Sequence, residues 1–120
     1  TEDRNRTELL QQLIEREALA STALSAGVAL PHPRAPSDAF TDAPIVVIAM
    51  LEQPVDWLAL DGELVHTAIL LLNPTAHEHL QVLSRLALVL REQKLVDALK
   101  ARSSAEDIFG IIDSLEPSNG

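Results

Sequence analysis

Gly27-Val28-Ala29-Leu30-Pro31-His32-Pro33-Arg34 combines a short apolar run with a histidine that stands between two prolines. The apolar residues predict a short buried strand, and the prolines end it because they cannot donate to a sheet ladder. Pro31 and Pro33 also restrict the backbone around His32, so its imidazole is presented from a stiff segment at a strand end. A neutral imidazole in this position can attack an electrophile such as a phosphoryl group. The alternative is a histidine that only fills a turn.

Length and composition indicate a single globular domain of 120 residues, 47% of them hydrophobic. We expect this domain to occupy residues 1–116, with residues 117–120 as a frayed tail. Nine basic residues against eighteen acidic ones give a net charge of −9, which opposes binding to nucleic acid or to an anionic membrane surface. The aromatic residues are one tryptophan and two phenylalanines, too few for a base-stacking surface, so no nucleic-acid partner is expected.

The absence of cysteine from the sequence excludes disulfides and thiolate metal sites and fits a reducing compartment. A cytoplasmic location is therefore expected. No apolar run approaches the roughly 20 residues of a spanning helix, and the first six residues lack the apolar core of a signal peptide. We expect no direct insertion into a membrane.

The first helix is predicted over residues 7–20, with Thr7 as its N-cap. Its hydrophobic face consists of apolar residues at helical spacing: Leu10, Leu13 and Ile14. Arg16 lies near the end of this helix, where the helix dipole favours a cation. Residues 35–44 are rich in Pro, Asp, Ser and Thr, which predicts a surface loop that forms one wall of a site.

Two longer apolar runs predict the main strands. Residues 45–51 are continuously apolar, which suggests a central strand covered on both faces. Residues 52–62 form a bent connection in which Trp57 is expected to pack over the sheet edge. A second strand is predicted over residues 64–72, and His66 inside it is interpreted as a packed residue rather than a ligand.

Thr75-Ala76-His77-Glu78 has the form of a capping box, so a helix is predicted to start there, with Glu78 reaching back to the amide of Thr75. His79 shares the core-facing stripe of that helix, whereas His77 lies on the opposite side and should be solvated. Two further helices are predicted over residues 92–101 and 104–115, the second capped by Ser103 or Ser104. Its predicted apolar face consists of Ile108, Ile111, Ile112 and Leu115.

Strand and helix signals together predict an α/β layer structure, in which ligands gather at strand ends and helix starts. His32 ends a strand and His79 starts a helix two strands later. If these ends meet, the site contains two imidazoles and the amides of a helix's first turn, with Arg16 and Arg34 as candidate cations. Each of these groups suits a phosphoryl group.

The sequence His77-Glu78-His79 also looks like a metal-chelating cluster. On a helix, however, the two imidazoles point in nearly opposite directions, and a metal site would need further ligands from elsewhere in the chain. We therefore expect no metal site. The sequence also lacks a phosphate-cradling loop and a dinucleotide fingerprint, so no cofactor is expected.

The chain resembles the type-2 enzyme IIA domains of the bacterial phosphoenolpyruvate-dependent phosphotransferase system, which include fructose, mannitol and nitrogen-regulatory members. The resemblance extends from about residue 8 to residue 115 and keeps the family's order and spacing. It is carried by Arg16-Glu17, Ser21-Thr22, the segment 27–32, Pro54-Val55-Asp56-Trp57 with Asp61-Gly62, and His79-Leu80 with Leu83.

This resemblance implies a mixed β-sheet flanked by helices on both sides. It also implies that His32 accepts the phosphoryl group, that His79 is the second active-site histidine and that Arg16 supports the site. Members of the family receive phosphate from a phosphohistidine carrier protein and pass it to a transporter IIB domain, or act as phosphorylation-dependent regulators. The sequence therefore leaves two hypotheses, a phosphoryl carrier for sugar transport and a regulatory domain whose phosphorylation controls partner binding.

Two departures from the family pattern are visible. Ala23 and Ser25 stand where the family often has glycine, so the approach to His32 is expected to differ in shape. The family also usually has another strand and helix before the helix that contains Arg16. We therefore expect the fold to lack its N-terminal strand and helix, and a sheet edge left uncovered is the sign that would accompany this.

Overall fold

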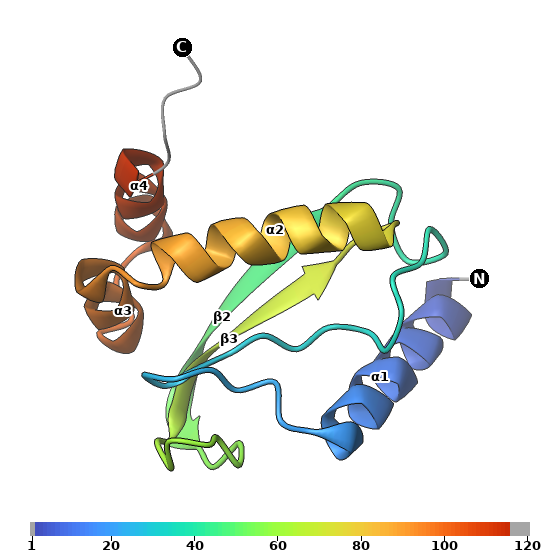
Figure 1. Cartoon of the computed structure of the whole chain (residues 1–120), viewed down its shortest axis with the longest axis horizontal. Coiled ribbons are helices and arrows are strands. Elements are labelled where there is room, and N and C mark those ends of the chain that lie inside the picture. The colour runs from blue at the N-terminus through green and yellow to red at the C-terminus, as the bar shows by residue number, and fades with distance from the viewer. Residues whose placement is uncertain (1, 116–120) are drawn as a thin grey trace.

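The computed structural model describes residues 2–115, which form a mixed three-stranded sheet and four helices (Figure 1). In chain order the elements are α1 (Glu2–Leu19), β1 (Val28–Ala29), β2 (Ile45–Val55), β3 (Val65–Leu72), α2 (Ala76–Val89), α3 (Gln93–Lys100) and α4 (Ala105–Leu115). The sheet order is β1-β3-β2, with β1 parallel and β2 antiparallel to β3. The predicted mixed α/β class is therefore confirmed.

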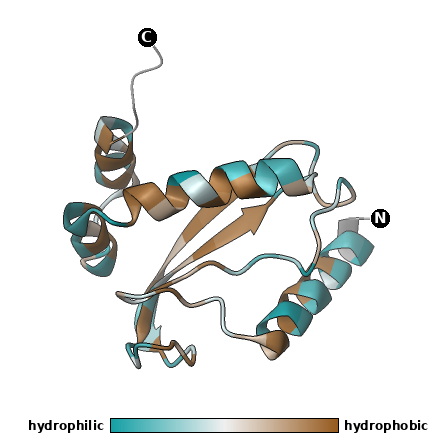
Figure 2. Cartoon of the chain, in the orientation of Figure 1, coloured by the Kyte–Doolittle hydropathy of each residue, from teal (hydrophilic) through white to brown (hydrophobic). Residues whose placement is uncertain are grey.

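Helix α2 runs across one face of the sheet, and its apolar side forms the main core with β1 and β3 (Figure 1). Figure 2 shows hydrophobic residues along both long strands and along α2, where they alternate with hydrophilic ones. The buried centre of this core consists of Val28, Leu30, Ile69 and Leu71, against which Val82, Leu83, Leu86 and Leu90 pack. This packing holds the segment that leads to His32 close to the helix that carries His79.

A second core joins the C-terminal helices to the end of α2. Val89, Leu95, Leu99 and Ile108 are its buried members, and the predicted apolar face of α4 packs on it. Of the two predicted caps, Ser104 is the one that acts, because its hydroxyl accepts a hydrogen bond from the amide of Asp107 at 3.1 Å. Both C-terminal helices begin and end within about one residue of their predicted bounds.

The central strand is β3, so the assignment of residues 45–51 to a central strand is wrong. Strand β2 lies at the sheet edge and continues to Val55, beyond its predicted end. Pro54 lies inside it, at a register irregularity between Met50 and Val55, which is a position that an edge strand tolerates. A continuous apolar run does not itself specify which strands flank it, and β3, also apolar, is the strand buried on both faces.

The outer edge of β2 makes no strand pair within the described range, and Ile45, Val46 and Val47 are 42%, 41% and 47% exposed. Apolar edge strands are usually covered in folded proteins. This is the sign expected above for a sheet that lacks a strand.

Helix α1 begins at Glu2, so Thr7 lies inside it and the predicted N-cap is wrong. The polar residues before Thr7 include good helix formers, and Arg4 and Glu8 form an exposed ion pair at i, i+4 spacing. The predicted hydrophobic face is only partly covered, because Leu10 and Ile14 are 58% and 60% exposed. In Figure 1, α1 lies at the opposite end of the molecule from α3 and α4.

Residues 117–120, predicted to be a frayed tail, lie outside the described residues. Among the described residues, no helix has the length and hydropathy needed to cross a bilayer.

Candidate functional site

The segment after β1 is held on both sides by backbone hydrogen bonds. The amide of Leu30 donates to the carbonyl of Thr22 at 3.0 Å, and the amide of Leu71 donates to the carbonyl of Pro31 at 3.0 Å. His32 follows directly and is half-buried, while Pro33 is buried. The sequence therefore places His32 at the end of a short strand, on backbone that is tied to its neighbours, as predicted.

His79 is placed by the start of α2. Thr75 is the N-cap, and its hydroxyl oxygen accepts a hydrogen bond from the amide of Glu78 at 3.2 Å, as predicted. The second half of the capping box differs, because the Glu78 carboxylate accepts from the Thr75 hydroxyl at 3.0 Å rather than from the Thr75 amide. His79 lies in the first turn and is half-buried, whereas His77 is exposed, as predicted.

The rings of His32 and His79 meet, with 5.0 Å between their centroids and an angle of 44° between their planes. The two residues come from a strand end and a helix start that lie 47 positions apart in the sequence (79 − 32). This contact confirms the prediction that the two ends are neighbours. The pair also lies beside the N-terminal end of a helix, where the helix dipole favours a negative charge.

One nitrogen of His32 is already engaged. Its Nδ1 lies 2.8 Å from the carbonyl oxygen of Leu30. Since a carbonyl oxygen can only accept, Nδ1 must carry the proton and donate it. The Nε2 atom of a neutral ring then keeps its lone pair, which is the state that a nucleophile requires.

His79 has a different environment. The side-chain amide nitrogen of Asn73 lies 3.3 Å from its Nδ1. Burial, and then repulsion from nearby His32, lower the pKa of His79 below the ordinary histidine value of 6.5. The ring is therefore mainly neutral at neutral pH.

A hollow of about 110 Å³ lies beside the two rings. It is lined by His32, Pro33, Arg34, Pro36, Leu71, Asn73 and His79. Pockets for drug-sized ligands usually measure roughly 300–1,000 Å³, so this one suits a small group such as a phosphoryl anion and not a nucleotide. Arg34 contributes a cation, with its side chain exposed at the rim.

The structure does not bring Arg16 into this hollow. Its guanidinium donates to the carbonyl oxygen of Ala20 at 2.8 Å, at the end of its own helix, where a cation is favoured by the helix dipole. Arg34, by contrast, lines the hollow together with both histidines. The supporting role of Arg16 that the resemblance implies stays a prediction.

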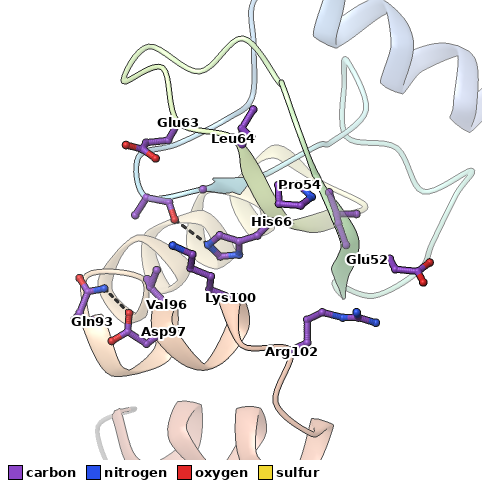
Figure 3. Close-up of a pocket in the computed structure, with 13 residues that line it drawn as sticks. Glu52, Pro54, Glu63, Leu64, His66, Gln93, Val96, Asp97, Lys100 and Arg102 are labelled. Atoms are coloured by element: carbon purple, nitrogen blue, oxygen red, sulfur yellow. Dashed lines mark hydrogen bonds between the residues drawn. The ribbon is translucent and has the colours of Figure 1, made fainter.

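His66 is a packed residue, as predicted, and Figure 3 shows it among the residues that line a cavity. It is 8% exposed, and both ring nitrogens are engaged: Nε2 lies 3.0 Å from the carbonyl oxygen of Ala26, and Nδ1 lies 2.7 Å from the hydroxyl of Thr67. It borders a cavity of about 540 Å³ that shares no lining residue with the hollow beside His32 and His79. His66 therefore takes no part in the candidate site.

The sequence reasoning missed Asn73, which lines the hollow and contacts His79. Its signal was available, because it directly follows a buried apolar strand, as His32 closely follows β1. Glu17 makes a further contact that the sequence does not predict. Its carboxylate accepts hydrogen bonds from the amide and the hydroxyl of Thr22 and so ties the end of α1 to the segment before β1. Local sequence cannot reveal that contact.

The metal-chelating alternative finds no geometric support. His77 points to solvent and His79 faces His32. Among the side chains of residues 4–115, no three of the His, Cys, Asp and Glu types lie close enough together to hold an ion.

We expect the stability of the protein to fall as the pH drops below about 6.5, and to fall less in His79→Gln. Burial, followed by repulsion from His32, lowers the pKa of His79 in the folded state, so the unfolded chain binds a proton at a pH where the folded ring is still neutral. The contribution is complete above the unfolded pKa and is lost as the pH falls through the folded pKa. Urea unfolding of the wild type, His79→Gln and the exposed control His77→Gln, between about pH 7.5 and about pH 5, measures it. Equal pH dependence in the wild type and His79→Gln would contradict the expectation.

Residues 2–115 match the family described as phosphoenolpyruvate-dependent sugar phosphotransferase system, EIIA 2. A nitrogen regulatory protein of Bradyrhizobium diazoefficiens is 33% identical over 110 residues, which cover 90% of this chain and 70% of that protein. A mannitol-specific phosphotransferase enzyme IIA component of Staphylococcus aureus is 30% identical over 109 residues, which cover 89% of this chain and 72% of that protein. The crystal structure of nitrogen regulatory protein IIA-Ntr from Neisseria meningitidis superimposes with a TM-score of 0.73 at 36% identity, over 85% of this chain and 69% of that one.

Proposed function

This chain belongs to the EIIA 2 family of the phosphoenolpyruvate-dependent sugar phosphotransferase system, and we propose that it carries a phosphoryl group on Nε2 of His32. The single observation that supports this most strongly is the contact between the rings of His32 and His79 at 5.0 Å, beside a small hollow. Because Nδ1 of His32 donates to the carbonyl of Leu30, Nε2 is the nitrogen left to react.

In the proposed step, the lone pair on Nε2 of His32 attacks the phosphorus atom of a phosphohistidine on the donor protein. The new P–N bond forms as the old one breaks in line, and the donor imidazole keeps the electron pair of the broken bond. The ring of His32 gains positive character during the transfer. Its Nδ1–H shares that charge with the carbonyl oxygen of Leu30, 2.8 Å away.

The remaining groups of the hollow act on the charge of the phosphoryl oxygens. His79 is neutral at neutral pH, because burial and the neighbouring His32 lower its pKa, and its ring N–H donates a hydrogen bond. Arg34 at the rim supplies a positive charge. We assign Arg16 a supporting role on the family resemblance alone.

The proposed donor is a phosphohistidine carrier protein, and the acceptor is a transporter IIB domain or a regulatory target. Enzyme IIA domains of this family take phosphate from such carriers. The half-buried position of His32 suits transfer between two proteins, since the ring is partly open to an approaching partner. No metal ion or cofactor is needed for this step.

A regulatory role is the second candidate, and the sequence identity to the relatives favours it. The nitrogen regulatory protein of Bradyrhizobium diazoefficiens is slightly more similar to this chain than the mannitol component of Staphylococcus aureus, at 33% against 30% identity. In that role, the added negative charge on His32 changes which protein docks at this surface.

Incubation with the donor proteins and labelled phosphoenolpyruvate tests the proposal. We expect label that is lost in acid and kept in alkali, as for a phosphohistidine, and that maps to His32 by fragmentation. Nuclear magnetic resonance of the product should place the phosphorus on Nε2. A wild-type chain that takes up no label, or takes it up elsewhere, would overturn the proposal.

A chase of the labelled chain separates the two roles. Transfer of the label to a IIB domain supports sugar transport. Retention of the label, together with a change in the affinity for a protein partner on phosphorylation, supports regulation.

A further inference from the structure

We propose that Asn73 is a positioning residue that holds the ring of His79 with its proton on Nε2. Asn73 directly follows β3 and is 4% exposed. Its side-chain amide nitrogen lies 3.3 Å from Nδ1 of His79, and both residues line the hollow beside His32. The inference rests on the proposed function where it concerns phosphoryl transfer, but the ring state that it assigns does not depend on that function.

The chemistry of the amide selects the ring state. A side-chain amide nitrogen donates and cannot accept, so Nδ1 of His79 must accept from Asn73 and be unprotonated. A neutral ring with this arrangement carries its proton on Nε2. Nε2–H is then the one polar hydrogen of the ring that can serve a phosphoryl oxygen. With the proton on Nδ1 instead, a lone pair on Nε2 would face the anion and repel it.

Asn73 is itself held in place by the segment that follows His32. Its backbone carbonyl accepts a hydrogen bond from the amide of Ser37 at 3.1 Å. Two residues earlier, the amide of Leu71 donates to the carbonyl of Pro31. Asn73 therefore contacts both parts of the candidate site. Its backbone carbonyl holds the segment after His32, and its side chain contacts the ring of His79.

The oxygen of the Asn73 side-chain amide makes the buried position of this residue costly. Its Oδ1 is buried and has no hydrogen-bond partner among the described residues. A buried polar atom of this kind costs about 1–3 kcal/mol, and native proteins retain few of them. Such an orphaned atom, in a side chain that touches an active-site histidine, points to a role in positioning rather than in packing.

The ring state of the wild type is measured first, by nitrogen-15 resonance of the imidazoles at about pH 7.5. We expect His79 to show an unprotonated Nδ1 and a protonated Nε2. This measurement needs no variant and no phosphoryl donor. A proton on Nδ1 of His79 would overturn the proposal, because the amide would then be turned with Oδ1 towards the ring.

Two variants separate the hydrogen bond from the packing. Asn73→Asp keeps the shape but cannot donate when ionised, and we expect it to draw a proton onto Nδ1 of His79. Asn73→Leu removes the donor without adding a charge, and we expect the rate of phosphoryl uptake by His32 to fall about 10- to 100-fold. The exposed ring of His77 serves as the internal control, and its resonances should not move in either variant.

An unchanged ring state of His79 in both folded variants would overturn the proposal. A failure of the proposed function looks different, because the wild type would then take up no label while the ring states still followed residue 73.

Discussion

Replacing His32 with glutamine is expected to abolish phosphorylation of the chain, from about one phosphoryl group per molecule to background. A glutamine amide has no basic lone pair, so no bond to phosphorus can form at this position. The fold should survive, since His32 is only half-buried and a glutamine of similar length can fill its place. Label uptake from phosphoenolpyruvate, with circular dichroism as the check of folding, measures the effect.

The matched control is His77→Gln, which changes a histidine that is exposed and lies outside the hollow. It should take up label as the wild type does. His79→Gln separates the proposed acceptor from the second histidine of the proposed site, because it should slow the transfer without removing the acceptor. Full labelling of His32→Gln, or loss of labelling in His77→Gln alone, would place the acceptor elsewhere.

The pairing of His32 with His79 could be predicted because both positions carry local signals. Prolines mark the strand end beside His32, and a cap marks the helix start before His79. Which nitrogen of each ring carries the proton could not be predicted in this way. It depends on the carbonyl of Leu30 and the amide of Asn73, and such side-chain contacts arise only when strands and helix are packed.

The order of the strands could not be predicted from the sequence for a related reason. The two apolar runs are residues 45–51 in β2 and residues 65–72 in β3, and both are mostly aliphatic. Hydrophobicity alone therefore does not distinguish the central strand from the edge strand. Pro54 is the signal in the sequence for an edge strand, but a proline is equally typical of a bent connection. Helix α1 shows the same limit, since its polar first turns gave no hydrophobic period to extend.

Gly27→Ala is expected to destabilise the protein by about 2–4 kcal/mol, a large part of the roughly 5–15 kcal/mol that holds a domain folded. Two effects add. Gly27 has φ of +82°, where an L side chain is strained, and a Cβ would lie 2.4 Å from Cδ2 of His66. His66 cannot move away easily, because both of its nitrogens are hydrogen-bonded and it is buried. The shift in the midpoint of urea unfolding measures the loss.

Gly62→Ala is the matched control that separates these two effects. Gly62 has φ of +74°, but a Cβ there would meet no atom within 4 Å, so this variant carries the backbone strain without the clash. It should cost about 1 kcal/mol. The difference between the two variants is then the cost of pushing His66 away from Gly27, whose carbonyl also accepts from the amides of His66 and Thr67 at the start of the β1–β3 pairing. Equal losses in the two variants would mean that His66 yields freely, and that the strand leading to His32 is not held by this contact.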